Sequence, residues 1–168
     1  GDKSTEINLM FISFDIGIFY YPLMVLVMIY ISNAVNLTDG VDGLCGSVTV
    51  VTMLALTTIC MIIKEYEVSM YAIAIAGGCL GFLVWNLHPA KCFMGDTGSL
   101  ALGATMATIA IITKHELTFI IVAGVFIFET LVCLIQIFSM VFLHKKVFLM
   151  TPYHHHLEKL GWKERDIV

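Results

Sequence analysis

We expect this sequence to form an all-α, polytopic membrane protein, and two observations predict it. First, 59% of the residues are hydrophobic, 13% are charged, and the mean hydropathy is +0.92, whereas a soluble domain has about 45–50% apolar and about 25% charged residues. Second, the apolar residues form long runs with only three prolines, where a membrane β-barrel would show short alternating segments. We expect a single membrane domain over residues 1–168, and no basic or aromatic pattern indicates nucleic-acid binding.

Five apolar runs are long enough to cross a membrane, which takes about 20 residues for about 30 Å of hydrocarbon. The fourth is short and rich in Ala, Gly and Thr, a composition that suits close packing against neighbouring helices. The fifth would reach about 40 Å as a straight helix, so we expect it to tilt, bend or extend past the interface. The runs are residues 16–35, 44–63, 70–88, 98–114 and 117–143.

If all five runs cross, three polar stretches emerge on the same side of the membrane: residues 33–43, 93–99 and 152–158. That side would carry six basic residues and the opposite side three, so the positive-inside rule predicts a cytoplasmic location for the stretches and an outer N-terminus. Because the chain begins at Gly1 without methionine, we expect a piece of a longer protein. The six basic residues are Lys91, Lys145, Lys146, Lys159, Lys163 and Arg165.

The first stretch repeats a polar side chain at every third position: Asn33, Asn36, Asp39 and Asp42. Residues three apart lie on one face of a helix or tight turn, so these side chains can form one stripe. Gly40 and Gly43 follow the two acids and allow backbone amides to turn inward as an anion nest. The alternative is capping, since an acid followed by glycine is ordinary turn chemistry. The doubled pattern favours Mg²⁺, which takes one or two carboxylates together with substrate phosphates.

The second stretch opens the fourth apolar run and contains Asp96. One interpretation is that Asp96 only caps the helix. The other is a phosphate site, because free amides at a helix N-terminus attract anions and Asp96 can hold a bridging cation. Phe93, just before it, can serve as an anchor at the membrane interface or as a plate on which a base stacks.

The third stretch contains three consecutive histidines, His154, His155 and His156. Adjacent helical residues diverge by about 100°, so the three rings cannot all bind one zinc ion. On an extended backbone, His154 and His156 would share one side and His155 would face the other. Hydrogen bonding or charge neutralisation at a phosphate is therefore favoured over chelation, and a solvated surface run is the alternative.

Two polar residues interrupt the fifth run. Glu129 and Gln136 are seven positions apart and lie on nearly the same helical face. An acid inside a span is a candidate functional residue, but we favour an interhelical hydrogen bond for Glu129. The cysteines are odd in number and contain no Cys-x-x-Cys pair, which indicates buried free thiols. They are Cys45, Cys60, Cys79, Cys92 and Cys133.

Together the three stretches resemble the phospho-N-acetylmuramoyl-pentapeptide transferase family, a group of bacterial membrane enzymes. The resemblance runs through residues 33–44, 93–100 and 152–158 and continues to Gly161 and Trp162, so it covers nearly the whole chain and fits the C-terminal half of the family. Sister enzymes that transfer N-acetylhexosamine 1-phosphate to polyprenyl phosphate share the aspartate motifs but usually interrupt the histidine run. The uninterrupted triplet therefore favours the muramoyl branch.

The resemblance implies Mg²⁺-dependent transfer of phospho-MurNAc-pentapeptide from UDP-MurNAc-pentapeptide to undecaprenyl phosphate, which gives lipid I and UMP in peptidoglycan synthesis. By analogy Asp96 binds Mg²⁺, and Asp39 with Asn36 lies beside the diphosphate. The implied catalytic residues are Asp39, Asp96, His154, His155 and His156. The implied uridine pocket comprises Gly40, Val41, Asp42, Asn86, Phe93, Met94, Gln136 and His155.

One departure from the family pattern bears on completeness. The family carries a paired-aspartate motif, Asp-Asp-x-x-Lys, in its N-terminal half, and this sequence has no adjacent acids. The last span of the family would also lie beyond Val168. We therefore expect a fragment of an enzyme of about ten helices in the bacterial inner membrane, with the bilayer, its own N-terminal half and, in a homodimer, a second copy as partners.

Two other classes predict different patterns. A channel or transporter subunit would use Glu129 and the aspartates as an ion path, which predicts polar residues along several spans, whereas these cluster at one surface. A CDP-alcohol phosphotransferase also uses Asp-Gly motifs with Mg²⁺. Its pattern continues with Ala-Arg, and here Val41 and Asp42 follow instead.

Overall fold

The structure is a computed structural model that describes residues 5–9 and 12–168. Within these residues, five helical segments are long and apolar enough to cross a membrane, as the sequence predicts. The all-α class is confirmed, with one short hairpin added. The five segments are Gly17–Thr38, Leu44–Ile62, Tyr66–Asn86, Gly95–Thr113 and Gly124–Leu143.

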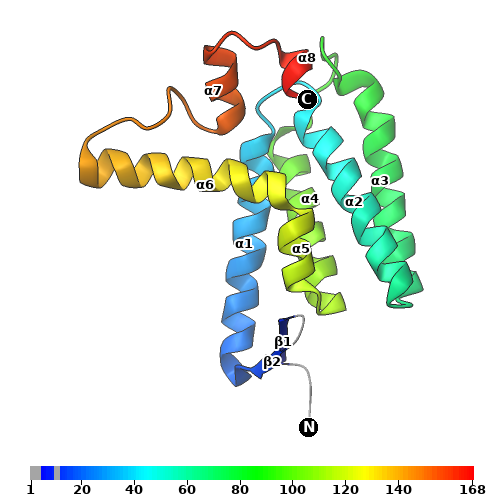
Figure 1. The fold of residues 1–168 in the computed structure, drawn as a ribbon. Helices are drawn as coiled ribbons and strands as arrows, with labels where there is room; N and C mark the ends of the chain where they lie inside the picture. Colours follow the sequence, from blue (N-terminus) through cyan, green and yellow to red (C-terminus); the bar gives the residue numbers. More distant parts are fainter. Residues whose placement is uncertain (1–4, 10–11) are drawn as a thin grey trace.

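Four long helices stand side by side in an upright bundle (Figure 1). Helix α2 packs against α3, and α1 packs against α4. Buried apolar side chains, among them Met53, Met106 and Phe126, form a core shared by the inner helix faces. Large apolar side chains on the outer faces are exposed and suit contact with lipid. The four helices are α1 (Tyr20–Thr38), α2 (Leu44–Ile62), α3 (Tyr66–Asn86) and α4 (Gly95–Thr113).

The small residues of α4 bring its backbone very close to α1. A Cβ atom added to Gly103 would lie 2.6 Å from the Cα of Ser32, a distance that side-chain rotation cannot relieve. The Ser32 hydroxyl donates to the carbonyl of Leu100 at 2.8 Å, across the same contact. The prediction that the fourth run packs closely is therefore confirmed.

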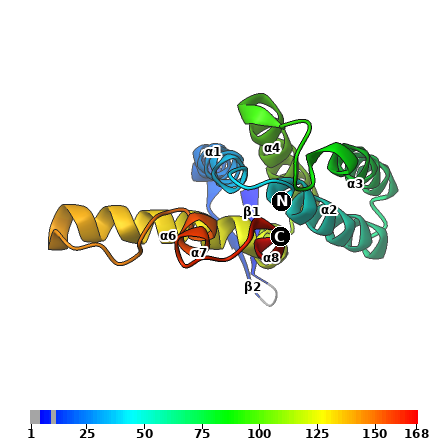
Figure 2. The same ribbon diagram turned by 90° about the horizontal axis from the view of Figure 1, so that it is seen from above.

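The fifth run is not one straight helix. It divides at Ala123 into α5 (Glu116–Val122) and α6 (Gly124–Phe138), and α6 continues as a π-helical turn, Ser139–Leu143. Helix α6 lies across the upright helices (Figure 1) and extends outward from them in the view from above (Figure 2). The expected bend is confirmed, and glycine at the first position of α6 is consistent with a break because glycine disfavours the helix interior.

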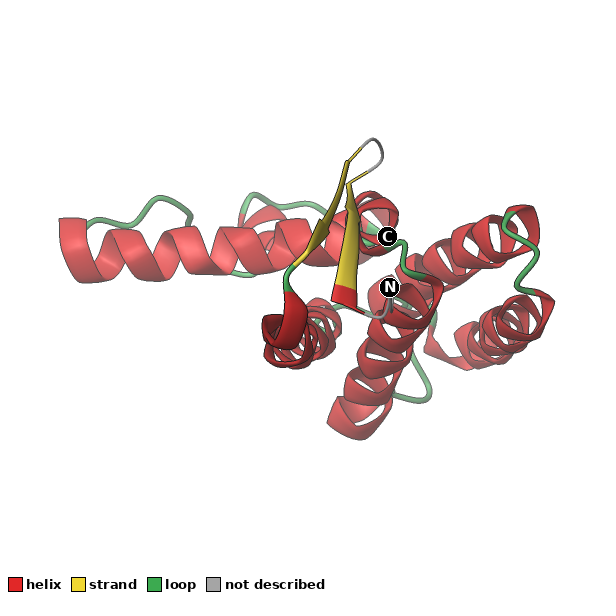
Figure 3. Cartoon of the chain, turned by 90° about the horizontal axis from the view of Figure 1, so that it is seen from below, coloured by secondary structure: helices red, strands yellow, loops and turns green. Residues whose placement is uncertain are grey.

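A β-hairpin precedes α1, at the end of the bundle opposite the three polar stretches (Figures 1 and 3). Strand β1 (Glu6–Leu9) pairs antiparallel with β2 (Ile12–Asp15), and a short 3-10 turn, η2 (Gly17–Phe19), leads into α1. Four alternating residues per strand are too few to stand out against long apolar runs.

The chain ends in two short helices, α7 (Tyr153–Lys159) and α8 (Glu164–Ile167), which lie above the bundle (Figure 1). The five cysteines, all within the described residues, are free thiols as predicted. The prediction that they are buried is wrong for Cys92, which is exposed because it lies in the loop between α3 and α4, and Cys133 is only half-buried.

Candidate functional site

The three polar stretches meet at one end of the molecule (Figure 1). They are the turn after α1, the loop before α4, and α7. The backbone of Gly40, in the first, lies directly against the ring of His154, in the third, and a side chain at position 40 would collide with that ring. The structure thus brings the stretches together as predicted, while the membrane side that they face stays a prediction.

Asp39 and Asp96 form a pair of carboxylates between the first two stretches. The side-chain amide of Asn36 donates to Oδ1 of Asp96 at 3.0 Å and to the hydroxyl of Ser99 at 2.9 Å. The Ser99 hydroxyl in turn donates to the carbonyl of Gly95 at 3.1 Å. Asn36 therefore fixes Asp96 on the first turn of α4, beside the end of α1.

The two carboxylates repel each other. Burial and, secondly, the charge of Asp96 raise the pKa of Asp39 above its ordinary value, and a hydrogen bond from the Gly95 backbone opposes this. A cation between the two groups would relieve the repulsion.

The structure argues against one of the two interpretations of Asp96, that it caps the helix. Helix α4 begins at Gly95, and its N-cap residue is Met94, without a side-chain capping bond. Asp96 lies inside the first turn and accepts from Asn36. Capping is therefore not its role here.

A cavity of about 210 Å³ lies where the first two stretches face each other. It is lined by the carboxylate pair and by five of the residues predicted for a uridine pocket. The ring of Phe93 is 73% exposed, so one face is open to a flat ligand. The lining residues are Asp39, Gly40, Val41, Asp42, Asn86, Phe93, Gly95 and Asp96.

Asn86 holds the two loops of this cavity together. Its Oδ1 accepts from the backbone N–H of Gly43 at 3.1 Å, and its Nδ2 donates to the carbonyl of Cys92 at 2.9 Å. The side chain is buried. Asn86 thus lines the cavity, while its side-chain amide is hydrogen-bonded to the backbone of the two loops.

Asp42 belongs to a cluster that the sequence did not predict. Its Oδ2 accepts from the backbone N–H of Ala90 at 2.9 Å and lies 3.1 Å from Nδ1 of His88. The same nitrogen lies 3.1 Å from Oε2 of Glu164, in α8. Asp42, His88 and Glu164 place one ligand atom each within 4.8 Å of one another. A protonated imidazole or a cation would balance the two carboxylates.

The three histidines lie on a helix, not on an extended strand. His154 and His155 both bring Nε2 against the backbone of Gly40, with their ring centroids 4.4 Å apart, whereas the His156 ring packs against Phe148 and Tyr153. His154 is buried, with Nδ1 3.4 Å from Oε2 of Glu129, and within the described residues neither of its ring nitrogens makes a hydrogen bond. His155 pairs with Glu158 at 2.5 Å. His156 accepts from the backbone N–H of Leu149 at 3.1 Å. In the part of the chain that the structure describes, the three rings therefore do not present their nitrogens to one common point.

Three of the predicted pocket residues are not part of the cavity lining: Met94, Gln136 and His155. His155 lies beside it, with Nε2 close to Gly40. Met94 packs against the core, with Sδ 3.9 Å from Sγ of Cys45. The Gln136 amide bonds to the backbone of Val147 and Phe148. The structure therefore does not bring Met94 and Gln136 together with the residues that line the cavity.

Comparison with known proteins shows the family to which this chain belongs. Residues 2–114 match the sequence model of glycosyl transferase family 4. The chain belongs to glycosyl transferase family 4. Helix α1, the carboxylate pair and the cavity lining all fall inside the matched range.

Relatives of known name extend the match to the histidine helix. The chain is 47% identical over 167 residues to the phospho-N-acetylmuramoyl-pentapeptide-transferase of Halalkalibacterium halodurans, a match that covers 98% of this chain and 51% of that protein. The protein of the same name from Bacillus pumilus is 46% identical over 94% of this chain and 48% of its own length. That of Clostridium botulinum (strain Eklund 17B) is 50% identical over 92% and 48%. The resemblance inferred from the motifs is confirmed, and the chain spans about half the length of these relatives.

Proposed function

We propose that this chain supplies the carboxylate, nucleotide-binding and histidine parts of a phospho-N-acetylmuramoyl-pentapeptide transferase. The reaction moves phospho-MurNAc-pentapeptide from UDP-MurNAc-pentapeptide to undecaprenyl phosphate and gives lipid I and UMP. The observation that carries the proposal is the cavity in which the Asp39–Asp96 pair adjoins the open ring of Phe93. The names of the relatives, at 46–50% identity, support the same activity.

The donor set fits Mg²⁺. The site offers two neighbouring carboxylates that repel each other, with a neutral amide beside them. Mg²⁺ in proteins is commonly bound by one or two carboxylates, and substrate phosphates complete its coordination. Asp96 and Asp39 would hold the ion. When bound there, Mg²⁺ withdraws charge from a diphosphate.

The remaining residues would bind and orient the substrate. Phe93 offers a ring on which uracil can stack. One Asp42 oxygen is held by Ala90 and His88, which leaves Oδ1 as an acceptor for an N–H of the base. His154 would meet the phosphates at Gly40, because its Nε2 lies against the backbone of that cavity residue. Its Nδ1 lies 3.4 Å from Oε2 of Glu129.

The setting is part of the proposal. We infer a bacterial inner membrane, with the site at the cytoplasmic face because basic residues gather at that end. The paired-aspartate loop would come from the N-terminal half of the same enzyme, and a homodimer is the expected assembly. Association with a second half would rest on close helix packing and interhelical hydrogen bonds, because apolar faces gain nothing by leaving lipid.

The test is reconstitution. The chain is purified alone and, separately, after co-expression with the N-terminal half of the Halalkalibacterium halodurans relative. Each preparation is then assayed with Mg²⁺, UDP-MurNAc-pentapeptide and undecaprenyl phosphate. We expect UMP and a lipid product only from the complemented pair, since phosphoryl transfer depends on holding both phosphates together. Turnover with UDP-N-acetylglucosamine in place of the muramoyl substrate would assign the sister activity, and no product from the pair would contradict the proposal.

A further inference from the structure

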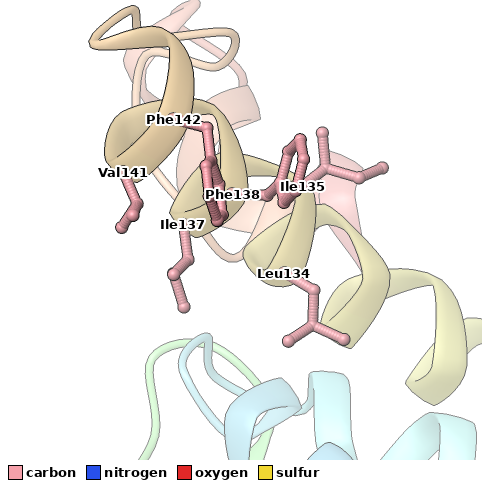
Figure 4. Close-up of a pocket in the computed structure, with 6 residues that line it drawn as sticks. All are labelled: Leu134, Ile135, Ile137, Phe138, Val141 and Phe142. Carbon is pink, nitrogen blue, oxygen red and sulfur yellow. The ribbon is translucent and has the colours of Figure 1, made fainter.

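Helix α6 has one polar face inside an otherwise apolar surface. Figure 4 shows six apolar side chains on the last turns of α6 and on the π-helical turn that follows it, and they line a shallow cavity of about 520 Å³. The polar residues Glu129, Gln136 and Ser139 lie elsewhere on the helix surface and bond to the segment that carries the histidines. The six apolar residues are Leu134, Ile135, Ile137, Phe138, Val141 and Phe142.

Gln136 holds the middle of that segment. Its Oε1 accepts from the backbone N–H of Val147 at 3.1 Å and of Phe148 at 3.0 Å, and its Nε2 donates to the carbonyl of Phe148 at 3.2 Å. Three bonds from one side chain to two consecutive residues fix both the position and the orientation of the backbone there. A polar side chain in an apolar setting is costly unless it is satisfied, and these bonds satisfy it.

Glu129 holds the start of the histidine helix. It lies seven residues before Gln136, two helical turns along the same face. Its Oε2 accepts from the backbone N–H of Tyr153 at 2.6 Å, a group with no partner inside α7, and lies 3.4 Å from Nδ1 of His154. One buried carboxylate thus contacts both the first residue of α7 and the buried histidine.

Ser139 completes the set at the π-helical turn. Its hydroxyl donates to the carbonyl of Lys145 at 2.7 Å. The rings of Phe128, on α6, and of Phe148 pack edge-on against Tyr153, at 5.2 and 6.5 Å between centroids. Residues 145–153 are therefore attached to α6 at three points along its length.

We propose that Glu129, Gln136 and Ser139 are positioning residues for the transfer reaction, because together they set where His154 lies against Gly40. We refer to these three residues as the α6 rail. They do not contact the cavity themselves and act through the backbone of residues 145–153 and the His154 ring. This inference rests on the proposed function, which gives His154 its task beside the phosphates.

The rail can be tested by graded substitution in the complemented enzyme. Gln136→Met keeps the volume and removes all three bonds, whereas Gln136→Glu keeps the acceptor and loses the donor. Ile137→Ala, on the apolar face next to Gln136, is the matched control. Glu129→Leu and Glu129→Gln form a second pair, with Leu131→Ala as control.

The first readout is amide hydrogen exchange, which requires no turnover. We expect Gln136→Met to accelerate exchange at Val147 and Phe148 by about tenfold, because two backbone N–H groups lose their acceptor. Gln136→Glu keeps an acceptor for both N–H groups but sets a carboxylate oxygen against the Phe148 carbonyl, so exchange should rise less than in Gln136→Met. Glu129→Leu should accelerate exchange at Tyr153, and both controls should change nothing at these amides.

The second readout separates positioning from general destabilisation. We expect Gln136→Met and Glu129→Leu to lower kcat by about 10- to 100-fold while KM for the nucleotide substrate stays within twofold, since misplaced catalytic groups lower the rate more than binding. Gln136→Glu, which keeps two of the three contacts, should lower kcat less than Gln136→Met does. Unchanged exchange, unchanged kcat despite faster exchange, or parallel changes in KM would each overturn the rail. An inactive wild-type complex would instead contradict the proposed function, and the exchange experiment would still report on the rail.

Discussion

The two sides of the candidate site are held by different means. The carboxylate side, Asp39 and Asp96, is carried by α1 and α4, whose backbones meet so closely that Gly103 has no room for a Cβ. The histidine side is carried by a seven-residue helix, α7. Hydrogen bonds from a few α6 side chains to the backbone of α7 and of the segment before it attach this helix to α6. Close packing over a whole helix resists small changes, whereas one lost bond can shift a short helix. Substitutions should therefore affect the two sides differently.

The largest effect is expected at the carboxylate side, with Asp96→Asn. The amide keeps a hydrogen-bonding group beside Asn36 but removes the negative charge that would hold the cation, so turnover of the complemented enzyme should fall by about 10³-fold. Thermal unfolding without Mg²⁺ should change little. Thr97→Ala, at the exposed next position, serves as control. Full activity in Asp96→Asn would exclude Asp96 as the metal ligand.

The next effect links the two sides through Gly40→Ala. The added methyl group collides with the ring of His154, so α7 must shift while Asp39 and Asp96 stay in place. We expect kcat to fall by about 10²-fold and stability to fall by about 1–3 kcal/mol from overpacking. Gly77→Ala, where a methyl group meets open space, should keep kcat and gain about 0.5–1 kcal/mol. Equal kcat values for the two variants would mean that the position of His154 against Gly40 does not matter for turnover.

A smaller effect is expected at the rim of the cavity, with His88→Ala. Loss of the imidazole removes a contact that holds Asp42, so KM for the nucleotide substrate should rise about threefold to fivefold, the range of a partly exposed ion pair. Since the carboxylate pair and the histidine helix are untouched, kcat should stay within twofold. His115→Ala, in the turn before α5, should leave both constants unchanged. A fall in kcat alone would place His88 with the reacting groups instead.

The smallest effect concerns the pH dependence of stability without Mg²⁺. Burial and the Asp96 charge raise the pKa of Asp39 above its ordinary value of 3.8, so the folded state disfavours its ionised form. The free energy of unfolding should therefore decrease as pH rises through the raised pKa. In EDTA, Asp39→Asn should have a slightly higher Tm than wild type at pH 7 and an equal Tm below about pH 3.8. Mg²⁺ should raise the Tm of wild type only. A lower Tm for Asp39→Asn at pH 7 would contradict the repulsion between the carboxylates.

The sequence by itself determined the membrane class, the five apolar segments and the meeting of the three polar stretches. Hydrophobic length is a local property, and short connections between long apolar runs leave little freedom in which ends meet. It also predicted seven of the residues that now line one cavity, from Asp39 to Asp96.

Only the tertiary structure decided the rest. The direction of α6 after the break at Ala123, the Asp42–His88–Glu164 cluster and the use of Gln136 by the backbone at Val147 and Phe148 all depend on contacts between residues distant in the chain. Gln136 and Glu129 read alike in the sequence, as polar residues in an apolar run. What each one does depends on which unsatisfied backbone groups the fold brings within hydrogen-bonding distance, because a polar group buried among apolar side chains must find a partner and only the folded chain supplies it.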